Sequence, residues 1–358
     1  MKKKTKKILV INPGSTSTKI ALFEDENKIS DRELYHSPQE LSRFKSNLDQ
    51  LDFRQEAVCN ALVEWGIPLA DLDAIIGRGG PLKPMESGVY KVGEHLLNDL
   101  RSGKLVDHAS ILGGLLAYKL ASDVEIPAFI ADPVSVDEFD DLARISGHPE
   151  LPRVSLSHAL NIKAVVAQAC RESKKNADKT NFIVAHLGGG ISIAAHRQGK
   201  LIDVNNANDA GPFSPERAGT LPLEGLLKMC FNGKYQLKEL KKMLIGKGGL
   251  IAHLGTSDIR EIDIKIDAGN SRASLVLEAM AYQIAKEIGA MATVLKGKVD
   301  GIILTGGVAH NKRTVHWITE RVSFIGPVIV IPGQNEMKAL ADHAMAALKH
   351  PETVKEYR

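Results

Sequence analysis

Hydrophobic residues in this chain form short uninterrupted runs that alternate with longer stripes. Short apolar runs bounded by glycine or polar residues predict buried strands, and apolar residues three and four positions apart predict helices that bury one face. The predicted strands are 7–12, 18–23, 74–76, 128–130, 302–304 and 328–331, and the predicted helices lie around 58–65, 109–120 and 277–295. Alternation of the two kinds of element indicates an α/β fold.

Two segments repeat the same order of elements. Residues 10–29 and 184–202 each contain a buried run, a turn of glycine, serine or threonine, an alternating strand and a polar hairpin tip. Their lengths differ by one residue. Such a repeat predicts two similarly folded halves, although two unrelated hairpins would produce the same pattern.

The composition narrows the class of protein. A chain of 358 residues with 44% hydrophobic and 25% charged residues is typical of a globular protein with two domains. The formal charge is +3, but Lys2, Lys3, Lys4, Lys6 and Lys7 contribute five of the positive charges. The rest of the chain is therefore not basic, which argues against a nucleic-acid partner.

The cysteine and hydropathy patterns indicate in which cellular compartment the protein is expected. The three cysteines lie far apart without a CxxC pair, so neither a disulfide framework nor a zinc site is expected. The apolar run 8–11 is too short for a signal peptide, and no stretch approaches the ~18 residues of a membrane span. We therefore expect a cytoplasmic protein without a membrane partner.

Glycine-rich turns follow three of the predicted strands, at Gly14–Thr18, Gly188–Gly190 and Thr305–Gly307. Phosphate binds where backbone N–H groups can approach closely, which glycine permits. A tight bend explains any one turn, but three together predict a nucleotide between two domains. The chain has no GxxxxGK[ST] motif and no GxGxxG after the first strand, which argues against a P-loop protein and a dehydrogenase.

Several charged residues stand at positions suited to anion and metal chemistry. Arg78 and Arg217 are flanked by glycine or proline and could each fork onto an anion, or form a surface salt bridge instead. Asp132 and Glu336 lie near strand ends, where oxygen ligands for Mg²⁺ are often placed. Glu336 could equally be a first-turn helix carboxylate. His158 precedes a predicted helix, where packing or capping is the alternative to a catalytic role.

Ten segments, in order, resemble the acetate/butyrate kinase family of the actin–Hsp70–sugar kinase superfamily. They are 10–19, 77–80, 107–110, 131–133, 157–161, 185–190, 211–219, 256–260, 304–307 and 335–336. Within the family, Arg-Gly-Gly-Pro-Leu, His-Ala-Leu-Asn and Gly-Pro-Phe-Ser-Pro-Glu-Arg are similar to the butyrate kinase branch. Two positions depart from that branch: Ser157 replaces an aromatic residue, and Ile111 replaces asparagine.

The resemblance implies roles on the acyl and phosphoryl side of a kinase site. Asn12 would contact the transferring phosphoryl group or its metal. Arg78 and Arg217 would bracket the carboxylate and the γ-phosphoryl group, and His158 would hydrogen-bond a phosphoryl oxygen. A carboxylate is already ionised at pH 7, so such a site needs cations and donors rather than a general base.

The resemblance also implies ATP and Mg²⁺ as cofactors. Asp132 and Glu336 would hold Mg²⁺ directly or through water. The two later glycine turns would cradle the ATP phosphates, and an aspartate–arginine pair would lie near the adenosine. The residues implied to bind ATP are Gly188, Gly189, Gly190, Asp258, Arg260, Gly306 and Gly307.

From this resemblance we expect two ribonuclease H-like domains of the actin/Hsp70 type that flank a nucleotide cleft. Residues 1–155 with 335–358 would form the acyl-substrate domain, and 156–334 the nucleotide-binding domain. The expected reaction is ATP plus butanoate giving ADP plus butanoyl phosphate, reversibly, in a homo-oligomer. The alternatives are an acetate, propionate or branched-chain acid kinase, and an actin- or Hsp70-like ATPase.

Overall fold

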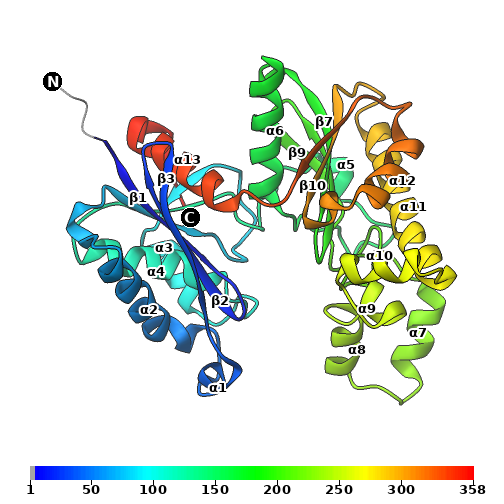
Figure 1. The fold of residues 1–358 in the computed structure, drawn as a ribbon, viewed down its shortest axis with the longest axis horizontal. Coiled ribbons are helices and arrows are strands. Elements are labelled where there is room, and N and C mark those ends of the chain that lie inside the picture. Colours follow the sequence, from blue (N-terminus) through cyan, green and yellow to red (C-terminus); the bar gives the residue numbers. More distant parts are fainter. Residues whose placement is uncertain (1–4) are drawn as a thin grey trace. The chain divides into compact units, whose positions relative to one another are not determined.

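A computed structural model describes residues 5–358 and divides into two compact units (Figure 1). Unit 1 comprises Met1–Val136 and Asn335–Arg358, and unit 2 comprises Asp137–Gln334. Residues 2–4, which carry part of the lysine-rich start, lie outside the described residues. No helix in residues 5–358 combines the length and hydrophobicity that a membrane crossing requires.

Unit 1 contains a seven-stranded sheet in the order β12-β5-β6-β4-β1-β2-β3. Its strands are β1 (Lys7–Pro13), β2 (Ser17–Glu24), β3 (Asn27–Tyr35), β4 (Ala74–Arg78), β5 (Val89–Lys91), β6 (Ala128–Ala131) and β12 (Lys355–Glu356). Its α-helices are α1 (Pro38–Leu41), α2 (Leu51–Glu64), α3 (Glu94–Arg101), α4 (Ile111–Ser122) and α13 (Glu336–Lys349). Its 3₁₀ helices are η1 (Leu48–Gln50), η2 (Leu69–Asp71) and η5 (Pro351–Thr353).

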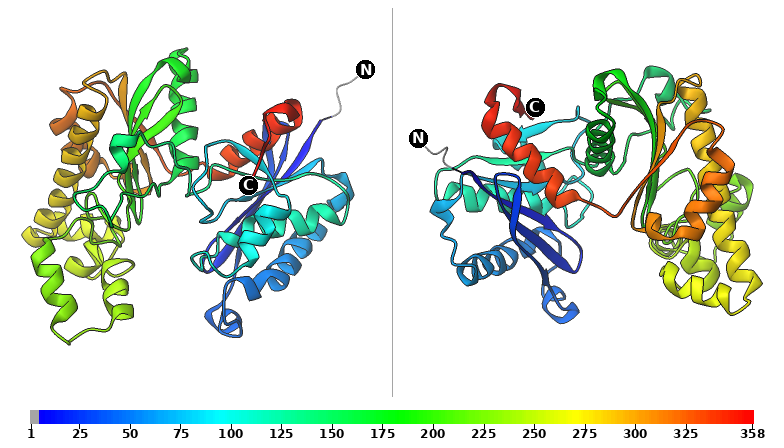
Figure 2. Two further views of the ribbon diagram at one scale, coloured as in Figure 1. Left: turned by 180° about the vertical axis from the view of Figure 1, so that it is seen from behind. Right: turned by 45° about the horizontal axis from the view of Figure 1, so that its top comes forward.

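Helices cover both faces of the unit 1 sheet. The views in Figure 2 place the red helix α13 on one side of the strands and the cyan and blue helices α4 and α2 on the other. Helix α4 is buried nearly all round because its sequence is apolar on every face. Its leucines and those of α2 pack against the strands in one hydrophobic core.

Unit 2 contains a five-stranded sheet in the order β11-β10-β7-β8-β9. Its strands are β7 (Asn181–Leu187), β8 (Ile191–Arg197), β9 (Lys200–Val204), β10 (Gly301–Gly306) and β11 (Val328–Pro332). Its α-helices are α5 (Asp141–Arg144), α6 (Ala159–Ser173), α7 (Leu223–Phe231), α8 (Leu237–Leu244), α9 (Gly249–Leu254), α10 (Ile259–Asp267), α11 (Ser271–Val294) and α12 (Lys312–Val322). Its 3₁₀ helices are η3 (Ala177–Lys179) and η4 (Gly307–His310).

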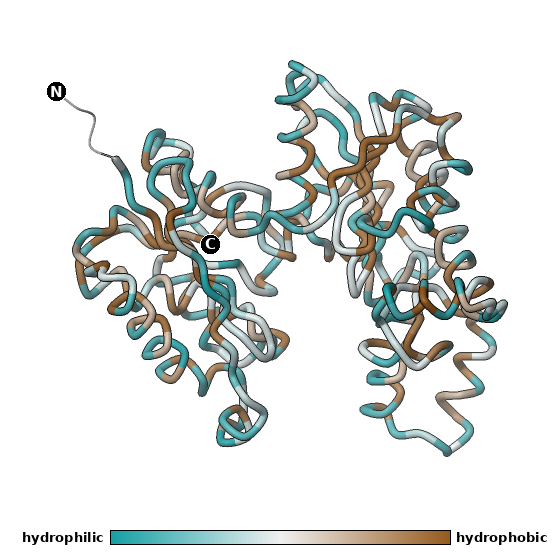
Figure 3. Tube along the Cα trace, in the orientation of Figure 1, coloured by the Kyte–Doolittle hydropathy of each residue, from teal (hydrophilic) through white to brown (hydrophobic). Residues whose placement is uncertain are grey.

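The unit 2 sheet is also covered on both faces, by α6 on one and by α11 on the other (Figure 1). The stripe predicted over 277–295 faces the strands and forms the centre of a second hydrophobic core. Figure 3 shows the hydrophobic residues concentrated along the central strands of each unit. All the strands and helices predicted from the hydropathy pattern are present, with helix ends shifted by up to seven residues.

The two units share one strand order. In unit 1, β6-β4-β1-β2-β3 has the same succession of parallel and antiparallel neighbours as β11-β10-β7-β8-β9 in unit 2. Each antiparallel hairpin also carries a register shift in its second pair, at Leu22/Phe23 and at Ala195/His196. The duplication predicted from the glycine turns is therefore confirmed.

Residues 137–155 belong to unit 2, although the sequence placed them in the first domain. They are held there by contacts with strand β9: the Asp140 N–H donates to the Ile202 carbonyl (3.0 Å), and Arg153 forms an ion pair with Asp203 (2.7 Å). These partners lie 62 and 50 residues further along the chain, so the local pattern gave no sign of them.

Candidate active site

Three side chains converge at one edge of the unit 1 sheet. Asn12 lies near the end of β1, Arg78 ends β4, and Glu336 begins α13. Strands β1 and β4 are parallel neighbours, so their carboxyl ends meet at the same edge. The Asn12 amide donates to Glu336 Oε2 (2.8 Å), and Arg78 donates to the same oxygen (3.1 Å). The structure thus joins three of the residues that the sequence singled out.

Asp132 belongs to the same edge, because it follows the strand residue that pairs with Arg78. Its backbone is in the left-handed region (φ 39°), and its side chain is almost fully buried. The Gly88 N–H donates to Oδ1 (2.6 Å), and His343 Nε2 contacts Oδ2 (3.0 Å). Sequence reasoning missed His343, although it lies seven residues after Glu336 and therefore on the same face of α13.

A buried arginine braces the first glycine turn. Arg54 of α2 is fully buried, and its guanidinium donates to the carbonyls of Gly14 and Ser17 (2.9 Å each) and to Thr18 Oγ1 (3.0 Å). Burial lowers the pKa of Arg54 to about 10. The turn's carbonyl groups are therefore satisfied from within the unit, a role that no sequence pattern indicated.

His158 of unit 2 is held by contacts that include Ser192 and His186. It stands at the N-cap of α6 without a capping hydrogen bond from its side chain, so the capping alternative is wrong. Its Nδ1 is 2.9 Å from Ser192 Oγ on β8. Its ring stacks on that of His186 with centroids 3.9 Å apart and planes 12° apart. The orientation of the His158 ring is therefore fixed by its surroundings.

His186, which the sequence analysis did not select, is fully buried near the end of β7. The Asn161 amide contacts its Nδ1 (2.9 Å), and the Gln334 amide contacts its Nε2 (3.2 Å). Asn161 also donates to Thr305 (3.2 Å), at the end of the parallel neighbour β10. A histidine two residues before a glycine turn was the available signal for this network.

The turn Gly188–Gly190 carries two charged side chains against its backbone. An added Cβ on Gly190 would lie 2.5 Å from the Arg217 guanidinium carbon, and one on Gly189 would lie 3.0 Å from the Glu216 carboxyl carbon. A side chain at either position would have to displace one of these charged groups. Burial lowers the pKa of Arg217. Arg217 lies beside the turn rather than in a surface salt bridge.

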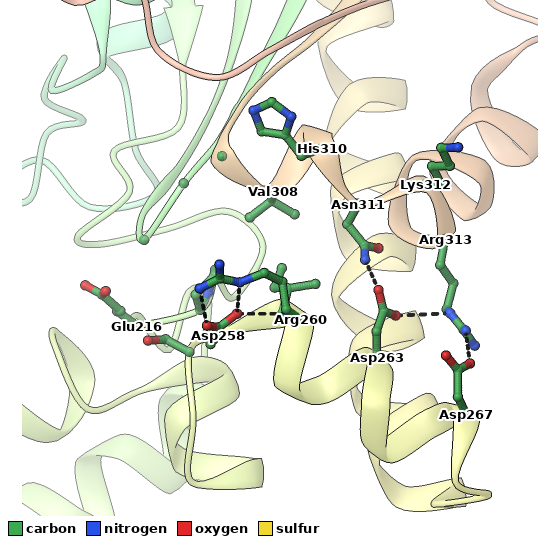
Figure 4. A pocket seen from close by; sticks show the side chains of 16 residues that line it. Glu216, Asp258, Arg260, Asp263, Asp267, Val308, His310, Asn311, Lys312 and Arg313 are labelled. Carbon is green, nitrogen blue, oxygen red and sulfur yellow. Dashed lines mark hydrogen bonds and ion pairs between the residues drawn. The ribbon is translucent and has the colours of Figure 1, made fainter.

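A pocket of about 900 Å³ lies within unit 2 (Figure 4). Its lining includes five of the residues that the sequence assigned to ATP: Gly188, Gly189, Gly307, Asp258 and Arg260. These come from three segments that are far apart in the sequence. Their convergence on one pocket is consistent with nucleotide binding.

The other two predicted glycines lie next to the lining residues. Gly190 accommodates the Arg217 guanidinium. Gly306 has φ 90°, and an added Cβ would be 2.3 Å from the Leu187 carbonyl oxygen. The backbone crossing at Gly306 thus fixes the start of η4, where an added Cβ on Gly307 would meet no atom within 4 Å.

Asp258 and Arg260 form an exposed ion pair at the start of α10. Asp258 caps the helix by accepting from the Arg260 N–H (2.9 Å), and the Arg260 guanidinium donates to its other oxygen (2.6 Å). These hydrogen bonds lower the pKa of Asp258 to about 2. The pair stays charged at neutral pH and presents both an acceptor and a donor to the pocket.

Glu336 and Asp132 are suited to a cation that takes most of its ligands from phosphate groups and water. Within residues 5–358, no group of three or more His, Cys, Asp or Glu side chains could hold a metal ion alone. Mg²⁺ in nucleotide-dependent enzymes usually takes one or two carboxylates together with phosphate oxygens and water. Glu336 fits this pattern, because its hydrogen bonds within the described chain involve Oε2 and leave Oε1 available. Both oxygens of Asp132 are engaged, which suits a contact through water.

Comparisons with known proteins agree on one family. The model of the acetokinase family matches residues 157–349. The chain is 53% identical over 351 residues to "Probable butyrate kinase 2" of Caldanaerobacter subterraneus subsp. tengcongensis, which covers 98% of this chain and 99% of that protein.

Solved structures agree on the fold. The acetate kinase of Porphyromonas gingivalis is 21% identical with a TM-score of 0.80, and the match covers 96% of this chain and all of that one. A propionate kinase from Francisella tularensis is 21% identical with a TM-score of 0.74, covering 94% and 98% of the two chains. A ROK hexokinase from Thermus thermophilus, 15% identical, has a TM-score of 0.51 and covers 97% and 99%. By its sequence and its fold, the chain belongs to the acetokinase family and is a kinase that uses ATP to phosphorylate a carboxylate.

Proposed function

We propose that this kinase transfers the γ-phosphoryl group of ATP to butanoate, giving ADP and butanoyl phosphate, and that it also runs in reverse. The cluster of Arg78, Asn12 and Glu336 carries this proposal, because it offers cationic and amide donors at a strand edge. A carboxylate acceptor needs such donors and no base. The butyrate kinase relative, 53% identical over nearly the whole chain, supports butanoate as the acid.

In the proposed reaction a carboxylate oxygen attacks the γ-phosphorus, and the bond to the β,γ-bridging oxygen breaks. Arg78 would bind the carboxylate, and Arg217 would bind the phosphoryl group beside the glycine turn. His158 would donate a hydrogen bond to a phosphoryl oxygen, since its ring orientation is fixed by Ser192 and His186. These groups offset the repulsion between two approaching anions, which is the main barrier of the reaction.

Glu336 would be the direct protein ligand of Mg²⁺, and Asp132 would contact it through water. The bound cation would neutralise charge on the transferring phosphoryl group. Asn12 would orient the Glu336 carboxylate through the hydrogen bond that it already makes. The pocket of unit 2 would hold the nucleotide, with its phosphates at the glycine turns and its ribose near Asp258 and Arg260.

We also propose that the chain forms a homo-oligomer through α7. None of the residues of α7 is buried, and Leu223, Leu227 and Phe231 are 77%, 57% and 86% exposed. Their spacing of four residues places them on one face of the helix. An apolar face of this kind is typical of a contact with another protein surface.

The reaction is tested by trapping acyl phosphate with hydroxylamine in the presence of ATP, Mg²⁺ and one carboxylic acid. Butanoyl hydroxamate should accumulate, and ADP release should depend on the added acid. ADP release without any acid would instead indicate an ATPase of the actin or Hsp70 type. Product from acetate or propionate but not from butanoate would assign a different acid.

A further inference from the structure

The Glu216 carboxylate lies directly against the glycine turn of the unit 2 pocket. The Glu216 N–H donates to the Gly189 carbonyl (3.2 Å), and Ser214 Oγ donates to the same oxygen (2.5 Å), so the backbone around Glu216 is fixed to the turn. The side chain reaches back over the Gly189 Cα. Figure 4 places it at the opposite end of the pocket from Asp267 and Arg313.

The other carboxylates of the pocket are paired with arginines. Asp258 pairs with Arg260 (2.6 Å), and Asp263 and Asp267 both pair with Arg313 (3.2 and 2.6 Å). The side chain of Glu216 makes no hydrogen bond or ion pair within residues 5–358, although it lines the same pocket. The pocket therefore places beside the turn a carboxylate that no arginine or lysine holds by a hydrogen bond, with the Arg217 guanidinium as its electrostatic neighbour.

The negative charge of Glu216 would repel the phosphates of a metal-free nucleotide. Metal-free ADP and ATP carry about three and four negative charges at neutral pH, and like charges a few ångströms apart near a protein surface repel strongly. A divalent cation bound to the phosphates would attract the Glu216 carboxylate, so the interaction between Glu216 and the nucleotide would become favourable. The adjacent Arg217 lies over Gly190, so the turn offers a cation to the phosphate oxygens and an anion to the metal.

We propose that Glu216 makes this pocket select the complex of nucleotide with a divalent cation and reject the metal-free nucleotide. The inference rests on the proposed function, because it takes the glycine turn as the phosphate site. It assigns to Glu216 a role in substrate choice that is separate from the metal ligand role proposed for Glu336.

The test is the dissociation constant of ADP, measured by calorimetry at fixed ionic strength, once with Mg²⁺ and once with EDTA. Wild-type protein should bind ADP at least about tenfold more tightly with Mg²⁺. In Glu216→Gln, metal-free ADP should bind about tenfold more tightly than in wild type, and Mg·ADP should bind a few-fold more weakly. The preference for the metal complex should therefore disappear. Glu216→Asp, which keeps the charge, should retain it.

Asp267→Asn is the matched control, because it removes one negative charge from the far end of the same pocket. It should leave the ratio of the two dissociation constants unchanged. An unchanged ratio in Glu216→Gln would overturn the inference, and so would a ratio lost equally in Asp267→Asn. Wild-type protein that binds ADP in neither condition would overturn the proposed function itself, so the two failures are distinguishable.

Discussion

At the scale of single residues, His158 can be assigned a donor role that is open to test. Replacing it with alanine should lower kcat by roughly 10²–10³-fold, because one hydrogen bond to the transition state is lost. His158→Gln keeps an N–H donor of similar reach and should retain at least about ten times the activity of the alanine variant. The measurements are kcat and the melting temperature of each variant.

The two alternatives for His158 give different results. If His158 were a general base, both variants would lose it, so kcat would fall equally and deeply in both while the melting temperature stayed unchanged. If His158 only packs against Ser192 and His186, both substitutions would lower the melting temperature and leave kcat near the wild-type value. Either pattern would contradict the donor role.

His196 on β8 predicts how stability depends on pH. Burial, followed by the nearby charge of Lys163, lowers its pKa to about 4, against about 6.5 in the unfolded chain. Between these values the unfolded state binds more protons, so stability falls as the pH is lowered through this range. The loss from this residue between pH 7 and pH 5 should be about 2 kcal/mol.

His196→Phe removes the titrating imidazole and puts a phenyl ring in its place. Its free energy of unfolding, measured by urea titration, should fall less between pH 7 and pH 5 than that of the wild type. His36, whose pKa is also lowered to about 4, remains in both proteins and therefore cancels in the comparison. Identical pH dependence in the two proteins would mean that His196 does not titrate as described.

From the sequence, single residues could be selected where a local motif marks the position. Arg78 and Glu336 stand beside recognisable turns, although only the fold shows that they share an ion pair across 258 residues. His186, His343 and Glu216 were missed for a physical reason. The two histidines depend on partners brought by other elements, and Glu216 lies against a glycine turn that is distant in the sequence, so neither residue type carries a local sign of its surroundings.

At the scale of elements, helix α4 crosses strand β4 at a pair of glycines. An added Cβ on Gly113 would lie 2.2 Å from the Arg78 carbonyl oxygen, and one on Gly77 would lie 2.0 Å from the Gly113 carbonyl oxygen. Gly113→Ala should therefore destabilise the protein by about 3 kcal/mol, because the backbones cannot stay in contact. It should also lower kcat, since the displaced strand end carries Arg78.

Gly289→Ala in α11 is the control, because an added Cβ there would meet no atom within 4 Å. Alanine at such a helical position usually stabilises by about 0.5–1 kcal/mol. The two substitutions should thus change the free energy of unfolding in opposite directions. A stabilising effect of Gly113→Ala would show that the crossing is looser than the structure indicates.

Helix α7 is the element that we expect to mediate assembly. Leu227→Lys places a charge in the middle of its exposed apolar face and should shift the protein to a lower mass by light scattering. Ile264→Lys on α10, a position that is 69% exposed, should leave the mass unchanged. An unchanged mass for Leu227→Lys would exclude this face as the contact.

At the scale of the whole molecule, the duplicated glycine turns predicted the architecture better than any single element did. Each repeat is a local unit, and residues 10–29 and 184–202 both form the predicted hairpin beside a parallel strand. The boundary between the units could not be predicted from such local repeats. Residues 137–155 contain only the short helix α5, and their place follows from distant contacts such as Arg153 with Asp203.

At the scale of the whole molecule we also expect a preference among carboxylic acids. The kcat/KM for butanoate should exceed that for acetate by about tenfold or more. Each buried methylene is worth roughly 0.8 kcal/mol, so two should contribute more than a factor of ten. Ile111 brings an apolar side chain close to Arg78: it is buried, and its Cα would be 2.9 Å from a Cβ on Gly80, two residues after Arg78. Hydroxamate formation measured with acetate, propanoate and butanoate should rise in steps of about fourfold per methylene. Equal kcat/KM for acetate and butanoate would show that the acid's alkyl chain stays in water, and the assignment of butanoate would then be wrong.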